Sequence, residues 1–163
     1  MPHGHRPTSN GRVANGVAAP PRRKVVLVVE DNGSVGGLIA GLLRQDGYRA
    51  VRAWDGQEAM RLARGRQPDL IVLDVSLSYP EGLTVLHQLR SNEATRRSPI
   101  VLVAGANANL GLSEDDAAAV DEVIQKPFDI DVMLNAVRKA LGDPLVEIQP
   151  RPYDVTDHFL HGY

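Results

Sequence analysis

Short apolar runs alternate with helix-like segments five times between residues 24 and 142. The first run, KVVLVV at 24–29, and the third, LIVLD at 70–74, are apolar at nearly every position. Strands have this composition when both faces of their sheet are covered, and the helices that connect parallel strands provide that cover. The alternation therefore predicts an α/β domain with helices on both faces of a parallel sheet.

The first helix and the second strand are the weakest of these elements. The helix is expected over about 34–45, with Leu38 and Leu42, and as further candidates Ile39 and Leu43, facing the core. Three glycines in it each cost roughly 1 kcal/mol of helix stability, so tertiary packing must hold it. The following run, YRAVRAW at 48–54, mixes charged and apolar residues and is expected at an edge of the sheet.

Two later helices have clear boundaries. Ser113 is a helix N-cap, with Asp116 at the third position of a capping box. Asp129 precedes an amphipathic helix that ends at Gly142. These boundaries place the domain at 25–142.

The two ends of the chain differ from this domain in composition. Residues 1–24 have five basic residues and no acidic one, which is typical of a solvated, disordered arm. Such an arm can contact nucleic acid weakly through its basic residues, but direct nucleic-acid binding is not expected. The tail at 143–163 contains His158 and His161, yet it lacks further spaced ligands for a metal. A short amphipathic segment that packs on the domain or on a partner is the favoured interpretation of this tail.

Composition excludes several other classes of protein. The 163 residues fit one domain with tails, and the absence of cysteine rules out disulfides and thiol chemistry. No apolar run approaches the roughly 20 residues of a membrane span, and the first residues lack the apolar core of a signal peptide. We therefore expect a cytoplasmic protein that does not enter the membrane.

Charged residues stand where three of the predicted strands end. Glu30 and Asp31 follow the first strand, Asp74 ends the third, and Lys126 follows the fifth. Carboxyl ends of parallel strands share one edge, so three carboxylates and one ammonium should converge. Clustered carboxylates repel one another unless a cation neutralises them, and an all-oxygen set with room for phosphoryl oxygens suits Mg²⁺. Asp74 is then placed to attack phosphorus as a nucleophile.

Over residues 25–142 the sequence resembles the receiver domain of two-component response regulators. The resemblance rests on the acidic pair, on PDLIVLD ending at Asp74, on Gly82 eight residues later, and on KPF at 126–128. Lys126 follows Asp74 by 52 residues, a spacing that fits the family. The resemblance implies a doubly wound, flavodoxin-like (βα)5 fold with five parallel strands in the order 2-1-3-4-5.

The resemblance also implies a role for each site residue. Asp74 would accept the phosphoryl group, Lys126 would pair with that group, and the peptide bond before Pro127 would be cis. The implied ligands of Mg²⁺ are Glu30, Asp31, Asp74 and the backbone carbonyl of Ser76.

Partners follow from the same resemblance. A receiver takes its phosphoryl group from a sensor histidine kinase or a phosphotransfer protein, and its phosphorylated face then binds a downstream protein or passes the group on. We expect a stand-alone signalling switch rather than an enzyme, because no second domain follows for output. The face of the fourth and fifth helices is a candidate for a homodimer.

Two positions depart from the family pattern. The family places Thr or Ser at the end of the fourth strand, where its hydroxyl binds the phosphoryl group, and this chain has Ala104. The family prefers Tyr or Phe three residues before the lysine, and this chain has Val123. Losing a hydrogen bond to a charged acceptor costs on the order of 1.5–3 kcal/mol, so the usual response to phosphorylation is missing. Candidate replacement donors are Asn107, Ser76 and Ser78, the last of which stands where the family has proline.

Other interpretations fit parts of the pattern. A pseudo-receiver would bind partners without phosphorylation; the missing hydroxyl and ring favour it, and the intact acids and lysine disfavour it. A phosphatase similar to the haloacid dehalogenases also uses a strand-end Asp with Mg²⁺, but it needs a second acid where this chain has Ser76. Taken singly, Asp74 could be a turn residue, Glu30 and Asp31 a helix cap, and Lys126 a surface lysine.

Overall fold

Five strands and five helices alternate along the computed structural model, which describes residues 22–78, 81–105 and 112–147. The predicted alternation of strands and helices is confirmed. The strands are β1 (Val25–Val29), β2 (Arg49–Ala53), β3 (Leu70–Asp74), β4 (Ile100–Ala104) and β5 (Glu122–Gln125), and the helices are α1 (Gly33–Gln45), α2 (Gly56–Arg66), α3 (Gly82–Ser91), α4 (Glu114–Ala118) and α5 (Ile130–Leu141).

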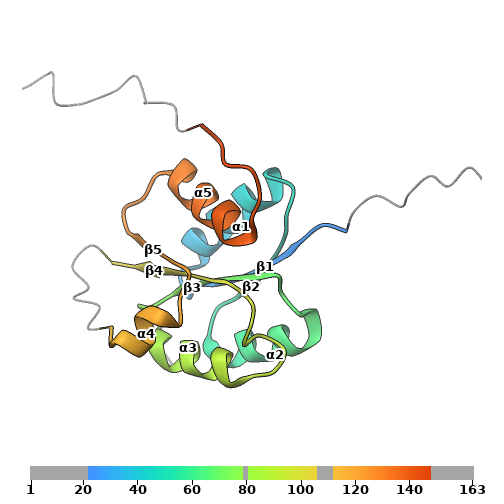
Figure 1. Ribbon diagram of the computed structural model, residues 1–163. Helices are drawn as coiled ribbons and strands as arrows, with labels where there is room; N and C mark the ends of the chain where they lie inside the picture. Colours follow the sequence, from blue (N-terminus) through green and yellow to red (C-terminus); the bar gives the residue numbers. More distant parts are fainter. Residues whose placement is uncertain (1–21, 79–80, 106–111, 148–163) are drawn as a thin grey trace, which may run out of the picture.

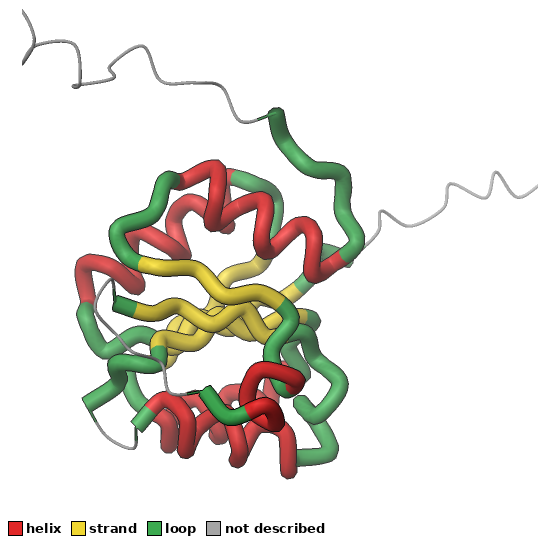
Figure 2. Tube along the Cα trace, turned by 60° about the vertical axis from the view of Figure 1, so that its left-hand side comes forward, coloured by secondary structure: helices red, strands yellow, loops and turns green. Residues whose placement is uncertain are grey.

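The strands form one parallel sheet in the order β2-β1-β3-β4-β5. Helices α1 and α5 cover one face, and α2, α3 and α4 cover the other (Figures 1 and 2). The predicted fold class and strand order are confirmed, and β2 lies at an edge as its mixed composition predicted. After β1 the chain continues toward one edge of the sheet, and after β3 it continues toward the other edge. The carboxyl ends of two such strands are where open α/β sheets place their binding sites.

Residues of β1 alternate between two hydrophobic clusters. Val26 and Val28 belong to the cluster that includes residues of α1 and α5, whereas Leu27 and Val29 belong to the cluster of α2 and α3. All four side chains are buried, and each contributes roughly 1.5–3 kcal/mol to stability. The central strand is therefore held firmly from both sides, and so is the polar segment that follows it.

Helix α1 faces the sheet only partly as predicted. Leu38 is 59% exposed and Leu42 is only partly buried, so the expectation that they face the core was wrong, whereas Ile39 and Leu43 are buried as expected. Successive residues of a helix are rotated by about 100°, so the exposed Leu38 and the buried Gly36 lie on different sides of α1. A Cβ atom at Gly36 would lie 3.3 Å from the side chain of Arg52. The buried residues of α1 are Gly36, Ile39, Ala40 and Leu43.

The helix boundaries follow local hydrogen bonding. Asn32 caps α1, because its side chain accepts hydrogen bonds from two backbone N–H groups of the first turn. The capping box of Ser113 and Asp116 is present at α4, as predicted. Asp129 occupies the N-cap position of α5, and Gly142 ends that helix with a φ of 68°.

Several predictions fall outside the described residues. They concern most of the basic arm, Asn107, and the tail segment with His158 and His161. Among the helices that the structure describes, none combines the length and the apolar character that crossing a membrane requires.

Candidate functional site

Residues from three strand ends meet at the carboxyl edge of the sheet. The register of β1 and β3 pairs Val29 with Leu73, so Glu30 and Asp74 follow neighbouring positions. The backbone N–H of Lys126, just after β5, donates to the carbonyl of Ala104 at 2.6 Å, which extends the ladder between β4 and β5. Parallel pairing thus brings together residues that are 96 and 52 positions apart in the sequence.

Lys126 connects the two buried carboxylates. Its Nζ donates hydrogen bonds to Oδ2 of Asp74 at 2.6 Å and to Oε2 of Glu30 at 2.8 Å. Both acidic side chains are 3% exposed, whereas the lysine side chain is 29% exposed. The ammonium therefore reaches the acids from the solvent side and neutralises part of their mutual repulsion.

The electrostatics of this cluster follow from burial and from the lysine. Burial raises the pKa of Glu30, the hydrogen bond from Lys126 lowers it in part, and the neighbouring Asp74 raises it again. Burial also lowers the pKa of Lys126, but the hydrogen bonds to Asp74 and Glu30 outweigh it, and the pKa is raised. Lys126 is thus a firmly charged ammonium, and two carboxylates share it.

Backbone N–H groups hold the remaining oxygens of these two acids. Oδ1 of Asp74 accepts from the N–H of Ser76 at 2.7 Å, and Oε1 of Glu30 accepts from the N–H of Asn32 at 3.0 Å. Each carboxylate is therefore fixed by one bond to the lysine and one to the loop that follows it. Side chains fixed in this way need little reorganisation before they react.

Asp31 does not join the other two acids. It is exposed, and its Oδ2 accepts from Ser78 twice, at 3.0 Å from the N–H and at 2.6 Å from the hydroxyl. The hydroxyl of Ser78 lowers the pKa of Asp31. Within residues 22–78, 81–105 and 112–147, no three acidic or histidine side chains gather closely enough to hold a metal ion. Lys126 joins two carboxylates of the expected cluster, Glu30 and Asp74, whereas the third, Asp31, is bound by Ser78.

The chemistry of the donor set still suits Mg²⁺. Carboxylate oxygens and a backbone carbonyl are the ligands this ion prefers, and Asp74 and Ser76 are two residues apart on the same loop. Asp31 is the one carboxylate among these implied ligands that accepts hydrogen bonds from Ser78 in this structure.

A glycine supports the loop after Asp74. A Cβ atom at Gly82, the first residue of α3, would lie 2.6 Å from the carbonyl oxygen of Asp74. Real Cβ atoms essentially never approach a backbone so closely. Helix α3 can therefore pack against the acceptor loop only with glycine at this position, which gives a physical reason for the Gly82 of the sequence motif.

The two positions that depart from the family pattern, Ala104 and Val123, lie on β4 and β5. Ala104 is fully buried at the carboxyl end of β4, and Val123 is 44% exposed on the edge strand β5. Neither side chain has a hydroxyl or an aromatic ring. The peptide bond between Lys126 and Pro127 is cis, as the resemblance implied.

Sequence reasoning missed Asn32 and the partner of Ser78, which it named only as a candidate donor to the phosphoryl group. Asn32 both caps α1 and donates its N–H to Glu30, and an Asn just before a helix is a recognisable cap. The bonds from Ser78 to Asp31 join positions 47 residues apart, and no local pattern in the sequence marks such a pair.

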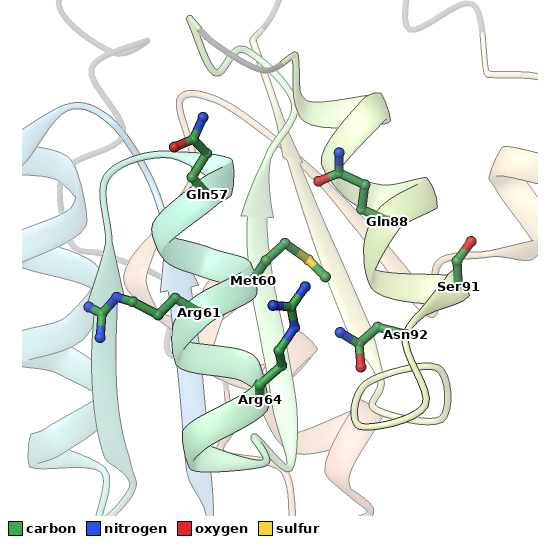
Figure 3. Close-up of a pocket in the computed structure, with 7 residues that line it drawn as sticks. All are labelled: Gln57, Met60, Arg61, Arg64, Gln88, Ser91 and Asn92. Carbon is green, nitrogen blue, oxygen red and sulfur yellow. The ribbon is translucent and has the colours of Figure 1, made fainter.

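A separate groove lies between α2 and α3, on the face of the sheet opposite α1 and α5 (Figure 3). Its volume is about 600 Å³, and none of its lining residues belongs to the acidic cluster. The lining residues are Gln57, Met60, Arg61, Arg64, Gln88, Ser91 and Asn92.

Comparisons with known proteins agree with this geometry. Residues 26–138 match the family model of the response regulator receiver domain. The chain is 31% identical over 120 residues to the polar-differentiation response regulator DivK of Brucella ovis, which covers 74% of this chain and 98% of DivK. It is 32% identical over 116 residues to the DNA-binding dual master transcriptional regulator RpaA of Synechocystis, with 71% of this chain covered but only 48% of RpaA.

Solved structures give the same result. The receiver domain of the sensor histidine kinase PA1611 from Pseudomonas aeruginosa has a magnesium ion coordinated in its active site cleft. It aligns with a TM-score of 0.66 and 30% identity, covering 75% of this chain and all of that one. The chemotaxis response regulator CheY4 of Vibrio cholerae, at 23% identity and a TM-score of 0.67, has the same fold; it covers 74% of this chain and all of its own. Because the family model spans more than half of the chain and one relative is matched over almost its full length, this chain belongs to the family of response regulator receiver domains.

Proposed function

We propose that this receiver accepts a phosphoryl group on Asp74 from a phosphohistidine of a sensor histidine kinase or a phosphotransfer protein. A carboxylate oxygen of Asp74 forms a bond to phosphorus while the bond between phosphorus and the imidazole nitrogen breaks. The chain then acts as a switch that binds a downstream protein, and it turns over no other substrate. A cytoplasmic location fits such a donor.

The observation that carries this proposal is the position of Lys126 between Asp74 and Glu30. Its ammonium is already 2.6 Å from the carboxylate that would react. A lysine with three donors can keep one bond to Glu30 while another follows the arriving phosphoryl oxygens. Phosphorylation adds about 1.5 to 2 negative charges, which this ammonium would partly balance.

Mg²⁺ would be held by Glu30, Asp31, Asp74 and the backbone carbonyl of Ser76. When bound, the ion would offset the negative charge of the transferred group. The magnesium described for the PA1611 receiver supports this assignment.

The test is phosphorylation in vitro. The full chain is incubated with acetyl phosphate, with either Mg²⁺ or a chelator, and the intact protein is weighed by mass spectrometry. The wild type should gain one phosphoryl group, and only when Mg²⁺ is present. Asp74→Asn should gain none, whereas Asp115→Asn, which removes an exposed carboxylate of α4, should behave as the wild type. An unlabelled wild type, or equal labelling of Asp74→Asn, would contradict the proposal.

Partner binding through β5 and α5 is the second part of this proposal. Val123, Ile130 and Val132 are all exposed there. Val123 and Val132 also line a hollow together with Pro127 and Phe128. An apolar surface of this kind suits a downstream protein, and a second copy of the chain is the alternative occupant. Sedimentation of the pure protein with and without phosphodonor separates them, because only a homodimer changes mass without an added partner.

A pseudo-receiver is the second candidate function. Buried Ala104 and exposed Val123 favour it, since neither can respond to a phosphoryl group by a hydrogen bond or a ring rotation. It predicts that no label appears on Asp74 while partner binding persists. The same labelling experiment therefore discriminates between the two functions.

A further inference from the structure

We propose that Ser78 is a latch that holds the carboxylate of Asp31 away from the metal site and so weakens the binding of Mg²⁺. The latch is the pair of hydrogen bonds that Ser78 donates to Oδ2 of Asp31, 2.6 Å from its hydroxyl and 3.0 Å from its N–H. The inference rests on the proposed function, because it assumes that Asp31 is a ligand of the ion.

The latch joins the two loops that build the site. Asp31 lies between β1 and α1, and Ser78 lies between β3 and α3, four residues after Asp74. Two charge-assisted bonds to one oxygen are stronger than two ordinary ones, and they fix both the carboxylate and the loop. The hydroxyl bond depends on this residue type, because alanine would offer only the N–H and proline would offer neither donor.

The other two acids have a different partner from Asp31. Glu30 and Asp74 are drawn together by Lys126, and both are buried. Asp31 is turned to Ser78 instead, and the residues that the structure describes contain no trio of acids able to share an ion. In the latch, the Asp31 carboxylate gives up the hydroxyl of Ser78 when it joins Asp74 on the ion.

Thermodynamic linkage determines whether removing the latch raises or lowers the affinity for Mg²⁺. If the latch exists only in the metal-free protein, removing it destabilises that state and leaves the metal-bound state unchanged. The Mg²⁺ affinity then rises by the same factor by which the metal-free protein is destabilised. The opposite sign is expected if Ser78 instead orients Asp31 as a ligand, since loss of such a partner typically costs about 10- to 100-fold in metal affinity.

The experiment measures Mg²⁺ binding by isothermal titration calorimetry on the full chain, without phosphodonor. Ser78→Ala removes the hydroxyl bond and should tighten binding about three- to tenfold, the size expected for one charge-assisted bond at an exposed site. Ser78→Thr keeps a hydroxyl and should bind as the wild type does. Ser78→Pro removes both donors and should tighten binding further.

A second measurement, thermal unfolding, tests the latch without a measured Mg²⁺ affinity. Thermal unfolding in a chelator should show a lower Tm for Ser78→Ala than for the wild type, and saturating Mg²⁺ should abolish the difference. Ser91→Ala is the matched control, because the hydroxyl of Ser91 is also exposed and donates one 2.8 Å bond to the carbonyl of His87. Its Mg²⁺ affinity should equal that of the wild type.

The outcomes separate the latch from the proposed function. If the wild type binds Mg²⁺ and Ser78→Ala binds it equally or more weakly, the latch is overturned while the acceptor site stands. If neither wild type nor variants bind Mg²⁺, the metal site of the proposed function fails, and the latch fails with it.

Discussion

The ammonium of Lys126 lies 2.6 Å from a carboxylate oxygen of Asp74 and so joins two strand ends that are 52 residues apart in the sequence. The same nitrogen also holds Glu30, at 2.8 Å. One cation therefore satisfies two carboxylates that are almost completely buried. Removing one partner of such a cluster leaves the remaining buried charges without an opposite charge beside them.

Lys126→Met should therefore destabilise the metal-free protein by about 1–3 kcal/mol, because two buried carboxylates lose their charged donor. Urea denaturation in a chelator measures the change. Added Mg²⁺ should return part of the lost stability, since a cation can replace the ammonium as the neutralising charge. Lys139→Met is the control: its ion pair with Glu122 is 65% exposed on the lysine side, and its loss should change stability little. Equal effects of the two substitutions would show that Lys126 has no special role.

Gly82→Ala should destabilise the protein by about 1–3 kcal/mol, the usual cost of overpacking. The added methyl group would meet the backbone at Asp74 and Val75, so α3 must shift away from the acceptor loop. Labelling of Asp74 by a phosphodonor should fall as well, because that shift moves the nucleophile.

Gly65→Ala is the matched control for this prediction. No atom lies within 4 Å of a Cβ atom at Gly65, which is inside α2. Alanine there should stabilise the protein by up to about 1 kcal/mol through helix propensity. A Gly82→Ala protein as stable as the wild type would show that the close packing at Asp74 can relax without cost.

Asp143→Asn tests the contacts that fix the segment after α5. Asp143 accepts hydrogen bonds from Lys24 at 2.6 Å and from the hydroxyl of Tyr48 at 2.9 Å. The bond from Lys24 is the main cause that lowers the pKa of Asp143, and the Tyr48 bond adds to it. A carboxyl group whose pKa is lowered by folding contributes stability above its unfolded pKa, and that contribution is lost as the pH falls through the folded pKa.

The expected result is a pH-dependent difference between Asp143→Asn and the wild type. At pH 7 the variant should be less stable by roughly 0.5–1 kcal/mol, because the ion pair is partly exposed. The difference should shrink as the pH falls below about 4, near the unfolded pKa of aspartate. Urea denaturation at a series of pH values measures it. A difference that is constant from pH 7 to pH 3 would show that the charge of Asp143 does not contribute.

Much of the fold could be predicted because its causes are local or periodic. Apolar runs fix the strands, and Ser113 and Gly142 mark helix ends by backbone hydrogen bonding. Parallel strand ends share an edge, which is why Glu30, Asp74 and Lys126 were correctly brought together.

The errors have tertiary causes. Leu38 was expected in the core, but α1 turns Gly36, Ile39, Ala40 and Leu43 toward the sheet, with Gly36 beside the side chain of Arg52. For Asp31, the sequence did not predict that a serine of the loop after Asp74 would bind it. Neither contact can be predicted from composition or spacing, because each depends on how two segments that are distant in the sequence pack in the fold.

Ala104→Thr restores a hydroxyl at the end of β4 and tests whether the missing one limits the switch. Ala104 is fully buried, so the larger polar side chain should cost about 1–3 kcal/mol in the unphosphorylated protein. Phosphorylation should recover part of that cost, because the new hydroxyl then gains a charged acceptor. Ala104→Val has nearly the same volume without the hydroxyl and should not recover. Denaturation of both variants with and without phosphodonor measures the effect; equal behaviour of the two variants would mean that phosphorylation at Asp74 is not sensed through β4.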